Sequence, residues 1–199
     1  MRFKWLIEEL RSDHAGETGA VYIYKGAAAA LQLRGSQSSD SSNFVSDHMT
    51  TEQLHLEYME GILPAELRST FLPIWRFSGW MLGWLPTVIG GDRWLFVTVD
   101  AVETFVDEHY LDQIKELRSS GWSEPSLENS NDRQDIVASR SSVPHLLALL
   151  EQCREDELHH RDDAREKHSQ GISIPLLESA WARVIDAGSR MAVRLARWG

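Results

Sequence analysis

A Glu-x-x-His pair occurs twice in this sequence, at Glu52 and His55 and again at Glu157 and His160. Residues three positions apart lie on one face of a helix, so each pair can direct a carboxylate and an imidazole at one point. Such a pair is a common half-site for a divalent transition metal, although chance supplies many single pairs. Two pairs, each within a predicted helix, are stronger evidence for a metal site than one.

Two further glutamates extend this pattern along the chain. Glu17 lies in "DHAGETGA" on the first predicted helix, and Glu103 lies in "DAVETFVDEHY" on the third. A two-metal site in a helical bundle needs one glutamate from each of two helices and a Glu-x-x-His pair from each of two others. The order Glu, Glu-x-x-His, Glu, Glu-x-x-His therefore predicts a dimetal site; the alternative is surface charge with chance pairs.

The charge balance agrees with a metal site and excludes other classes. Four buried carboxylates without a cation would be very costly, whereas two divalent ions would neutralise them. The chain has 30 acidic and 20 basic residues, a formal net charge of −10, so we expect no nucleic-acid partner. The single cysteine, Cys153, excludes an internal disulfide and a cysteine-rich zinc site.

Apolar residues at helical spacing predict an all-α chain. The expected helices span residues 3–33, about 50–68, 92–119, 143–168 and 175–197. Residues 34–44, "RGSQSSDSSNF", have the Gly/Ser-rich composition of a loop, and Pro64 is expected to bend or end the second helix. Residues 120–142 are rich in Ser and Asn, and we expect a mobile loop there.

The segment "FLPIWRFSGWMLGWLPTVIGG", residues 71–91, is apolar with one charge, Arg76. Its glycines and prolines interrupt it, and its uncharged part is shorter than the roughly 20 apolar residues of a membrane-spanning helix. Tryptophan favours the membrane–water interface. We therefore expect an apolar interfacial helix or re-entrant hairpin between the second and third helices, one that admits a lipid tail. A buried core hairpin or a dimer interface is the alternative.

Five stretches together resemble the demethoxyubiquinone hydroxylase family: "RSDHAGETGAVYIYKG", "EQLH", "VETFVDEHYLDQI", "REDELHHRDD" and "VIDAGSRMAVRLARW". The resemblance covers residues 3–198 apart from loops. It implies a ferritin-like four-helix bundle with an extra C-terminal helix, forming a single di-iron domain over residues 1–199. It also implies a peripheral membrane mono-oxygenase that hydroxylates the ring of a prenylated quinone in quinone biosynthesis.

The resemblance assigns the six residues of the repeated pattern as ligands of two iron ions (Fe2+/Fe3+). The glutamates of the two pairs, Glu52 and Glu157, would bridge the irons. Each iron would be completed by a histidine and a further glutamate: Glu17 with His55, and Glu103 with His160. Molecular oxygen would be the co-substrate, and the electron donor would be external, either NADH or a quinol.

Some neighbouring residues keep two interpretations. His109 and Tyr110 match the family's His-Tyr dipeptide and are candidate catalytic residues, for hydrogen bonding or for proton and electron delivery; a polar core pair is the alternative. Asp156 and Asp100 could each hold a ligand histidine by its far nitrogen, or serve on the surface. His14 is expected to be a hydrogen-bonded core histidine rather than a ligand.

Three function classes fit these observations: a quinone-ring mono-oxygenase, a ferritin-like ferroxidase or peroxidase, and a non-catalytic lipid-quinone-binding protein. We favour the first, because the apolar segment suits a lipid substrate and a scaffold has no reason to bury four acids. The expected location is peripheral, on the cytoplasmic face of a membrane. We also allow for a homo-oligomer or a lipid-binding partner protein.

Overall fold

The computed structural model of the chain describes residues 2–35, 39–119, 142–170 and 173–198. Within these ranges all regular structure is helical, as the sequence predicted. The elements are α1 (Arg2–Arg34), α2 (Ser39–Ile62), the 3₁₀ turn η1 (Ala65–Leu67), α3 (Leu72–Ser119), α5 (Val143–Ser169) and α6 (Pro175–Trp198). The mobile loop expected at residues 120–142 lies outside the described residues except for Ser142.

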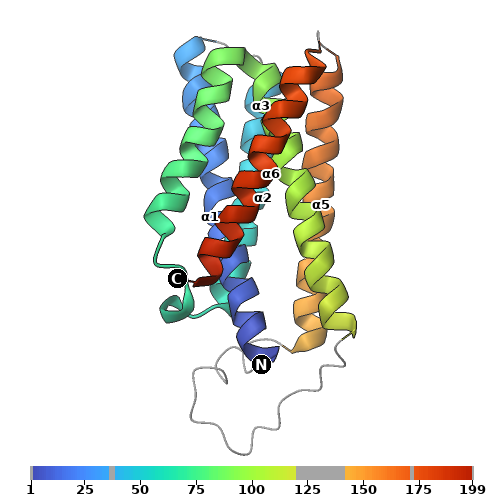
Figure 1. The fold of residues 1–199 in the computed structure, drawn as a ribbon. Helices are drawn as coiled ribbons and strands as arrows, with labels where there is room; N and C mark the ends of the chain where they lie inside the picture. Colours follow the sequence, from blue (N-terminus) through green and yellow to red (C-terminus); the bar gives the residue numbers. More distant parts are fainter. Residues whose placement is uncertain (1, 36–38, 120–141, 171–172, 199) are drawn as a thin grey trace, which may run out of the picture.

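Two apolar clusters hold a four-helix bundle made by α1, α2, the second half of α3 and α5 (Figure 1). One lies toward the N-terminal end of α1, and the other toward its C-terminal end. Each cluster takes side chains from all four helices, so neither end of the bundle depends on a single helix pair. The cluster near the N-terminal end of α1, here called the lower cluster, includes Leu10, Met59, Ile114 and Leu150. The cluster near the C-terminal end of α1, the upper cluster, includes Tyr24, Phe44, Leu95 and Ala164.

Helix α3 bends sharply at Gly91, whose φ of 70° and ψ of −158° lie outside the helical region. A positive φ costs glycine little because it has no Cβ. The first arm of α3, residues 72–90, lies along α1, and the second arm, residues 92–119, runs back through the bundle (Figure 1). The two arms therefore form a helical hairpin whose turn is Gly91.

Of the two forms expected for residues 71–91, a helix or a re-entrant hairpin, the structure has the helix, because residues 72–90 form a single helical arm and the chain turns only at Gly91. Two of its glycines face α1 instead of breaking the helix. A Cβ on Gly79 would lie 2.3 Å from the carbonyl oxygen of Gly19, and one on Gly83 would lie 1.8 Å from that of Ile23. These glycines allow close packing of the arm against α1.

Helix α2 begins well before the expected position near residue 50, so the loop prediction for residues 34–44 is largely wrong. Phe44 and Val45 are buried against Tyr24 and Leu31 of α1 in the upper cluster. Burial of these apolar side chains outweighs the low helix propensity of the surrounding Ser and Asp residues. The helix ends at Ile62, before Pro64, as the proline predicted.

Helix α6 lies obliquely across α1 and α3 on the outside of the bundle (Figure 1). Polar contacts hold both of its ends. The Arg93 guanidinium donates to Glu178 Oε1 at 2.7 Å, and Arg197 Nη2 donates to Glu9 Oε2 at 2.7 Å. Between them, the indole of Trp181 donates to Thr98. The extra C-terminal helix expected from the resemblance is therefore docked on the bundle.

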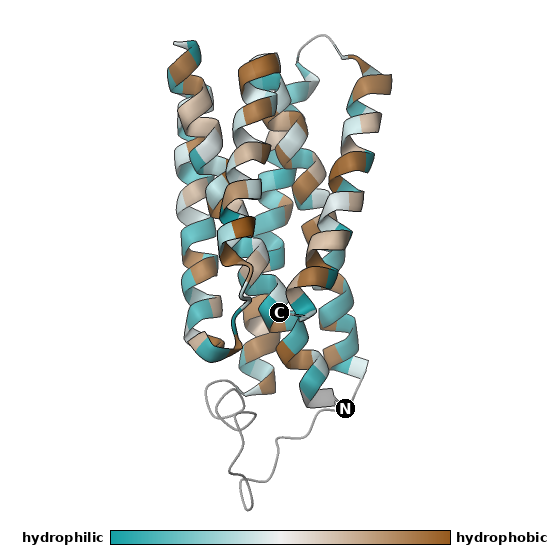
Figure 2. Ribbon diagram, turned by 60° about the vertical axis from the view of Figure 1, so that its left-hand side comes forward, coloured by the Kyte–Doolittle hydropathy of each residue, from teal (hydrophilic) through white to brown (hydrophobic). Residues whose placement is uncertain are grey.

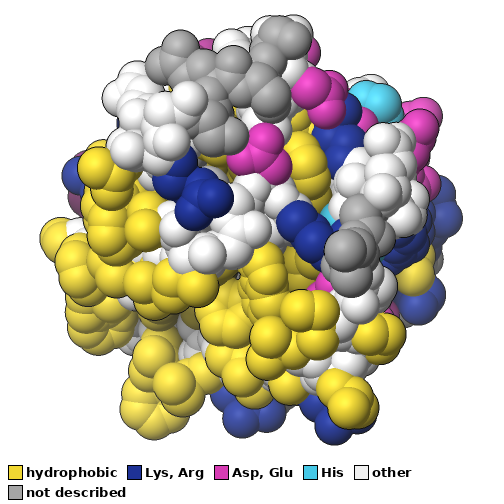
Figure 3. Space-filling model, turned by 90° about the horizontal axis from the view of Figure 1, so that it is seen from above, with side chains coloured by type: hydrophobic (Ala, Val, Ile, Leu, Met, Phe, Trp, Pro, Cys, Tyr) yellow, Lys and Arg dark blue, Asp and Glu magenta, His cyan; other side chains and the backbone are white. Residues whose placement is uncertain are grey.

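The first arm of α3 and helix α6 expose large apolar side chains. They include Ile74, Phe77, Leu85 and Ile89 on the arm, and Leu176, Val184, Met191 and Trp198 on α6. Viewed down the bundle, hydrophobic side chains gather along the lower and left sides, while most visible acidic side chains lie elsewhere (Figure 3). None of the described helices is long and apolar enough to cross a membrane, and hydrophilic residues interrupt each of them (Figure 2).

Candidate metal centre

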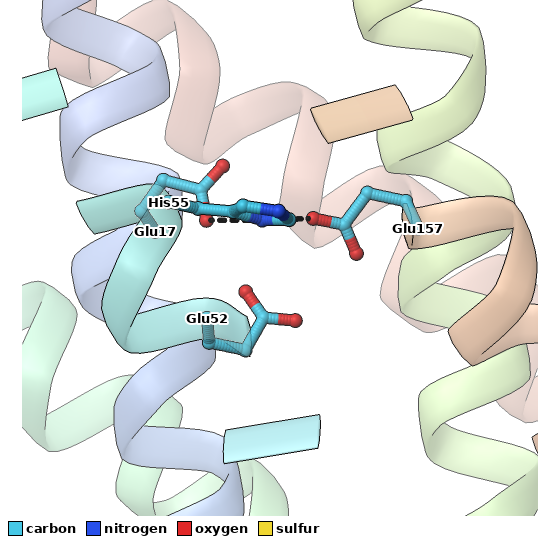
Figure 4. A group of neighbouring side chains, drawn as sticks. All are labelled: Glu17, Glu52, His55 and Glu157. Atoms are coloured by element: carbon cyan, nitrogen blue, oxygen red, sulfur yellow. Dashed lines mark hydrogen bonds and ion pairs between the residues drawn. The ribbon is translucent and has the colours of Figure 1, made fainter. Parts of the chain in front are cut away.

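The six side chains of the repeated pattern converge in the interior of the bundle. They form two overlapping groups of four residues. Within each group, the potential ligand atoms all lie within 4.8 Å of one another. The first group is Glu17, Glu52, His55 and Glu157 (Figure 4), and the second is Glu52, Glu103, Glu157 and His160. The two glutamates of the Glu-x-x-His pairs are therefore shared between the groups, and all six side chains are buried.

Both histidines direct Nδ1 at the carboxylates. His55 Nδ1 lies 3.0 Å from Glu157 Oε1 and 3.8 Å from Glu17 Oε2. Dashed lines in Figure 4 mark these contacts on either side of the His55 ring. His160 Nδ1 lies 3.1 Å from Glu52 Oε1 and 3.2 Å from Glu157 Oε2. The Nε2 atoms are left for contacts away from the centre of the site.

Concentrated negative charge dominates the electrostatics. Burial, together with repulsion from neighbouring carboxylates, raises the pKa values of Glu17, Glu52 and Glu103. Burial also acts to raise the pKa of Glu157, but hydrogen bonds from His160 and His55 lower it to about 2.

The histidines respond to the same charges in the opposite direction. Although burial disfavours the imidazolium, the hydrogen bond with Glu157 and the other carboxylates raise the pKa of His55 to about 11. The pKa of His160 is raised to about 10 by Glu157 and Glu52. The raised pKa values of the histidines and of three glutamates all mean that the site favours bound protons, which offset its negative charge; bound cations can take over that role.

Two carboxylate oxygens test whether the residues fit a metal. Glu52 Oε2 is buried without a hydrogen bond among the described residues, and Glu17 Oε2 is likewise buried, with His55 Nδ1 no nearer than 3.8 Å. Buried polar atoms are normally paired, so such oxygens call for a partner that the protein does not supply. Four carboxylates and two imidazoles, with two carboxylates in common, suit two divalent transition metal ions.

Neighbouring side chains orient two of the six, His55 and Glu17. His55 Nε2 lies 3.0 Å from Asp156 Oδ2, and the Tyr110 hydroxyl donates to Glu17 Oε1. Of the two interpretations left open for Asp156, the structure favours contact with a predicted ligand histidine, His55. Asp100 instead pairs with Arg165 and His168 and does not hold His160.

His48 was missed by the sequence reasoning. Its ring stacks on that of His160 with centroids 4.2 Å apart and planes 19° apart. Its Nε2 lies 3.2 Å from Asp163 Oδ2. Burial, followed by the neighbouring His160 and His159, lowers the pKa of His48 to about 3. The available signal was its position four residues before Glu52, which places both on one helix face.

His109 belongs to a polar array beside the six residues. Its Nε2 lies 3.1 Å from Asp13 Oδ1, and Gln113 Nε2 donates to the same oxygen at 2.7 Å. Burial acts to lower the pKa of His109, but Asp13 and Glu9 raise it. The sequence reasoning missed Asp13, Glu9 and Gln113, although Asp13 lies one turn before Glu17 on α1.

Two further buried side chains, His14 and Cys153, lie near the six converging residues without joining them. His14 is buried three residues before Glu17, and its nearest charged neighbour is Glu60 at 3.6 Å. Both of its ring nitrogens lack a hydrogen bond among the described residues, so it is a core histidine but not a hydrogen-bonded one. Cys153 is a buried thiol four residues before Glu157. Neither residue belongs to the converging groups.

A cavity of about 530 Å³ opens onto the site from the side covered by α6. It lies between α1, both arms of α3 and α6. All four converging carboxylates, together with His109 and Tyr110, reach its wall. The rest of the wall is mainly apolar, with Ile23, Leu82, Val102, Phe105, Ile185 and Ala192 among its side chains. An apolar ligand with a small polar head could therefore reach the carboxylates.

Known proteins resemble this chain over most of its length. A family model described as "Ubiquinone biosynthesis protein COQ7" matches residues 4–196. The chain is 30% identical over 194 residues to the mitochondrial NADPH-dependent 3-demethoxyubiquinone 3-hydroxylase of Caenorhabditis elegans, covering 96% of this chain and 89% of that protein. It is 30% identical over 187 residues to the 3-demethoxyubiquinol 3-hydroxylase of Rhodospirillum rubrum, covering 92% and 74%.

A third relative is the mitochondrial 5-demethoxyubiquinone hydroxylase of Saccharomyces cerevisiae, which is 28% identical over 199 aligned positions. That alignment covers 95% of this chain and 74% of the yeast protein. The family match includes all six converging residues within its range. These relatives are hydroxylases of ubiquinone precursors by name, which agrees with the function class that the sequence favoured.

Proposed function

The chain belongs to the ubiquinone biosynthesis protein COQ7 family, and we propose that it hydroxylates the ring of a demethoxyubiquinone-like prenylated quinone. It is a mono-oxygenase of ubiquinone biosynthesis that uses molecular oxygen as co-substrate. The observation that carries the proposal is the apolar cavity ending at the buried carboxylates. Its volume and lining suit a quinone ring followed by the start of an apolar tail.

We propose that the six converging residues hold two iron ions, with Glu52 and Glu157 as the shared ligands. Glu17 and His55 would complete one position, and Glu103 and His160 the other, following the two groups of ligand atoms. Bound there, the ions would supply the redox chemistry that activates oxygen. The whole chain would then act as one ferritin-like di-iron domain.

The protein's own residues would bind the substrate and exclude water. Apolar side chains of α6 and of the first arm of α3 would enclose the ring and limit wasteful oxidation. Tyr110 would keep Glu17 in place through its hydroxyl. His109, held at Nε2 by Asp13, would present its ring at the cavity wall as a hydrogen-bond partner for a quinone oxygen.

We propose that electrons come from an external donor. The names of the relatives from Caenorhabditis elegans and Dictyostelium discoideum specify NADPH, so a reduced nicotinamide is the first candidate and a quinol the second. The apolar face formed by α3 and α6 would place the protein at a membrane surface as a peripheral protein, where the lipid substrate is found. We place it on the cytoplasmic face; a second copy or a lipid-binding protein could cover the same face.

The proposal is tested by supplying the reduced, iron-loaded protein with a demethoxyquinone analogue and isotopically labelled oxygen. Mass spectrometry should find one labelled oxygen atom on the ring, and no label with the Glu157→Ala variant. Rapid consumption of oxygen or peroxide without label on any quinone would reject the proposal in favour of a ferroxidase or peroxidase.

A further inference from the structure

The two Glu-x-x-His repeats differ in the residue that precedes the glutamate. In the first repeat Thr51 precedes Glu52, and in the second Asp156 precedes Glu157. Asp156 reaches across the bundle, where its Oδ2 lies 3.0 Å from His55 Nε2. Thr51, at the equivalent place, uses its hydroxyl within its own helix, with Asp47 O as acceptor at 3.5 Å. The two histidines therefore have different surroundings.

His55 is the histidine with a carboxylate on each side. Its Nδ1 faces the centre of the site, and its Nε2 faces Asp156, which also accepts a hydrogen bond from Gln152 through its other oxygen. A carboxylate at the outer nitrogen fixes the tautomer of a ligand histidine and makes the inner nitrogen a stronger ligand. Asp156 is thus placed to strengthen one position only.

His160 is supported in another way. The carboxylates that contact it, Glu52 and Glu157, do so through Nδ1. One face of its ring is covered by the ring of His48, which Asp163 holds through Nε2. Stacking restrains the plane of the imidazole without adding charge at its outer nitrogen. His48 can therefore orient His160, but it cannot raise its strength as a ligand as Asp156 does for His55.

We infer that the two metal positions are unequal: the position of Glu17 and His55 binds its ion more tightly and fills first, with Asp156 and His48 as the respective positioning residues. This inference rests on the proposed dimetal centre and specifies its order of assembly. An ordered assembly means that an intermediate with one ion per chain, held at the Glu17 side, exists during loading.

Anaerobic titration of the metal-free protein with Co2+ tests this order, using calorimetry and the visible absorption of the bound ion. The wild type should bind two ions in two resolved steps. Asp156→Asn keeps an acceptor oxygen at Nε2 but removes the charge, and should weaken the first step by about 10- to 100-fold. The exposed neighbour Glu155 supplies the matched control, since Glu155→Gln should leave both steps unchanged.

Further variants assign each step to a position. Glu103→Ala should keep the tight step, and Glu17→Ala should lose it. His48→Ala should weaken the second step and shift its absorption band, whereas His48→Phe, which keeps an aromatic ring against His160, should restore both. A merely structural role of His48 would change folding stability without changing the band.

The outcomes separate the inference from the function on which it rests. Binding of two ions in indistinguishable steps, or a first step unaffected by Asp156→Asn, would overturn the inference and leave the dimetal centre standing. A tight step that survives Glu17→Ala but not Glu103→Ala would reverse the order and also overturn it. Failure to bind any ion would reject the proposed centre itself.

Discussion

Glu52 and Glu157 differ from the other four converging residues because each belongs to both groups of potential ligand atoms. Their neighbours Glu17, Glu103 and the histidines belong to one group each. This difference arises from their places on facing helices, α2 and α5, between the two apolar clusters. At the scale of single residues, it predicts that substitutions will differ in how many ions they remove.

The first prediction concerns metal content. Wild-type protein should hold about two iron ions per chain. Glu157→Ala should lose both ions because it removes a shared ligand, whereas Glu103→Ala should retain about one. Elemental analysis of protein purified and loaded without oxygen would measure this, with Glu155→Ala as the control that keeps full content. Equal content in all variants would contradict the assignment of these glutamates.

The second prediction concerns the pH dependence of the metal-free protein. His55 and His160 have folded-state pKa values raised to about 11 and about 10, above 6.5, and Glu17 and Glu103 also have raised values. Between the unfolded and folded pKa values, the folded state binds more protons than the unfolded state. Stability should therefore fall as pH rises from about 6.5 toward about 10.

Thermal unfolding of metal-free protein at several pH values from 6.5 to 9 would measure this fall. Loading with metal should flatten the dependence over that range, because bound cations replace the protons that balance the carboxylates. A metal-free protein whose melting temperature rises with pH over this range would show that the site's charges are balanced in another way.

At the scale of elements, the first arm of α3 is held to α1 by close contact between backbones. A Cβ on Gly26 would meet the carbonyl oxygen of Trp80 at 2.1 Å, and Gly79 and Gly83 face α1 equally closely. Trp80 and Trp84 stack on each other, with centroids 5.5 Å apart and planes 15° apart. The arm forms one wall of the cavity, so this packing positions the substrate site as well as stabilising the fold.

The third prediction is that Gly83→Ala will separate the arm from α1. The added methyl group would overlap the Ile23 carbonyl, and the substitution should destabilise the protein by about 1–3 kcal/mol. Urea denaturation would measure the change. Gly61→Ala is the control, since a Cβ there meets nothing within 4 Å, and it should be neutral or stabilising. Equal effects of the two substitutions would argue against close backbone packing.

At the scale of the whole molecule, an acidic protein presents one apolar face. The formal net charge is −10, yet the exposed side chains of the α3 arm and α6 are largely apolar, and arginines such as Arg190 and Arg194 accompany them on α6. The same two elements form walls of the cavity. A surface that binds lipid and a cavity that accepts a lipid quinone would therefore lie side by side.

The fourth prediction is that this face carries membrane binding. Phe77 and Ile89 are 67% and 75% exposed, so replacing both with Ser removes apolar surface at little cost to folding. The double variant should bind liposomes more weakly in a flotation assay while retaining its metal. Leu54→Ser with Tyr58→Ser on α2, at 45% and 44% exposure, is the matched control. Equal liposome binding by wild type and both variants would favour a protein partner on this face.

The helices at 3–33, 92–119, 143–168 and 175–197 were predictable from local signals, because apolar periodicity, Pro144 and Pro175 act within a turn or two of the chain. The early start of α2 was not, because Phe44 and Val45 are helical through contacts with α1. The sequence around Gly79 and Gly83 does not show whether these glycines interrupt a helix or allow it to pack closely. The close contact of both glycines with the α1 backbone shows that they allow close packing.

The sequence by itself determined which six residues could converge, because the spacing within each Glu-x-x-His pair and the order of the glutamates along four predicted helices can be read from the chain alone. Only the tertiary structure decided that Asp156 reaches His55, that His48 stacks on His160, and that α6 encloses a cavity beside the carboxylates. Asp156 and His55 lie 101 residues apart. A contact of that kind depends on how whole helices pack, which no local spacing specifies.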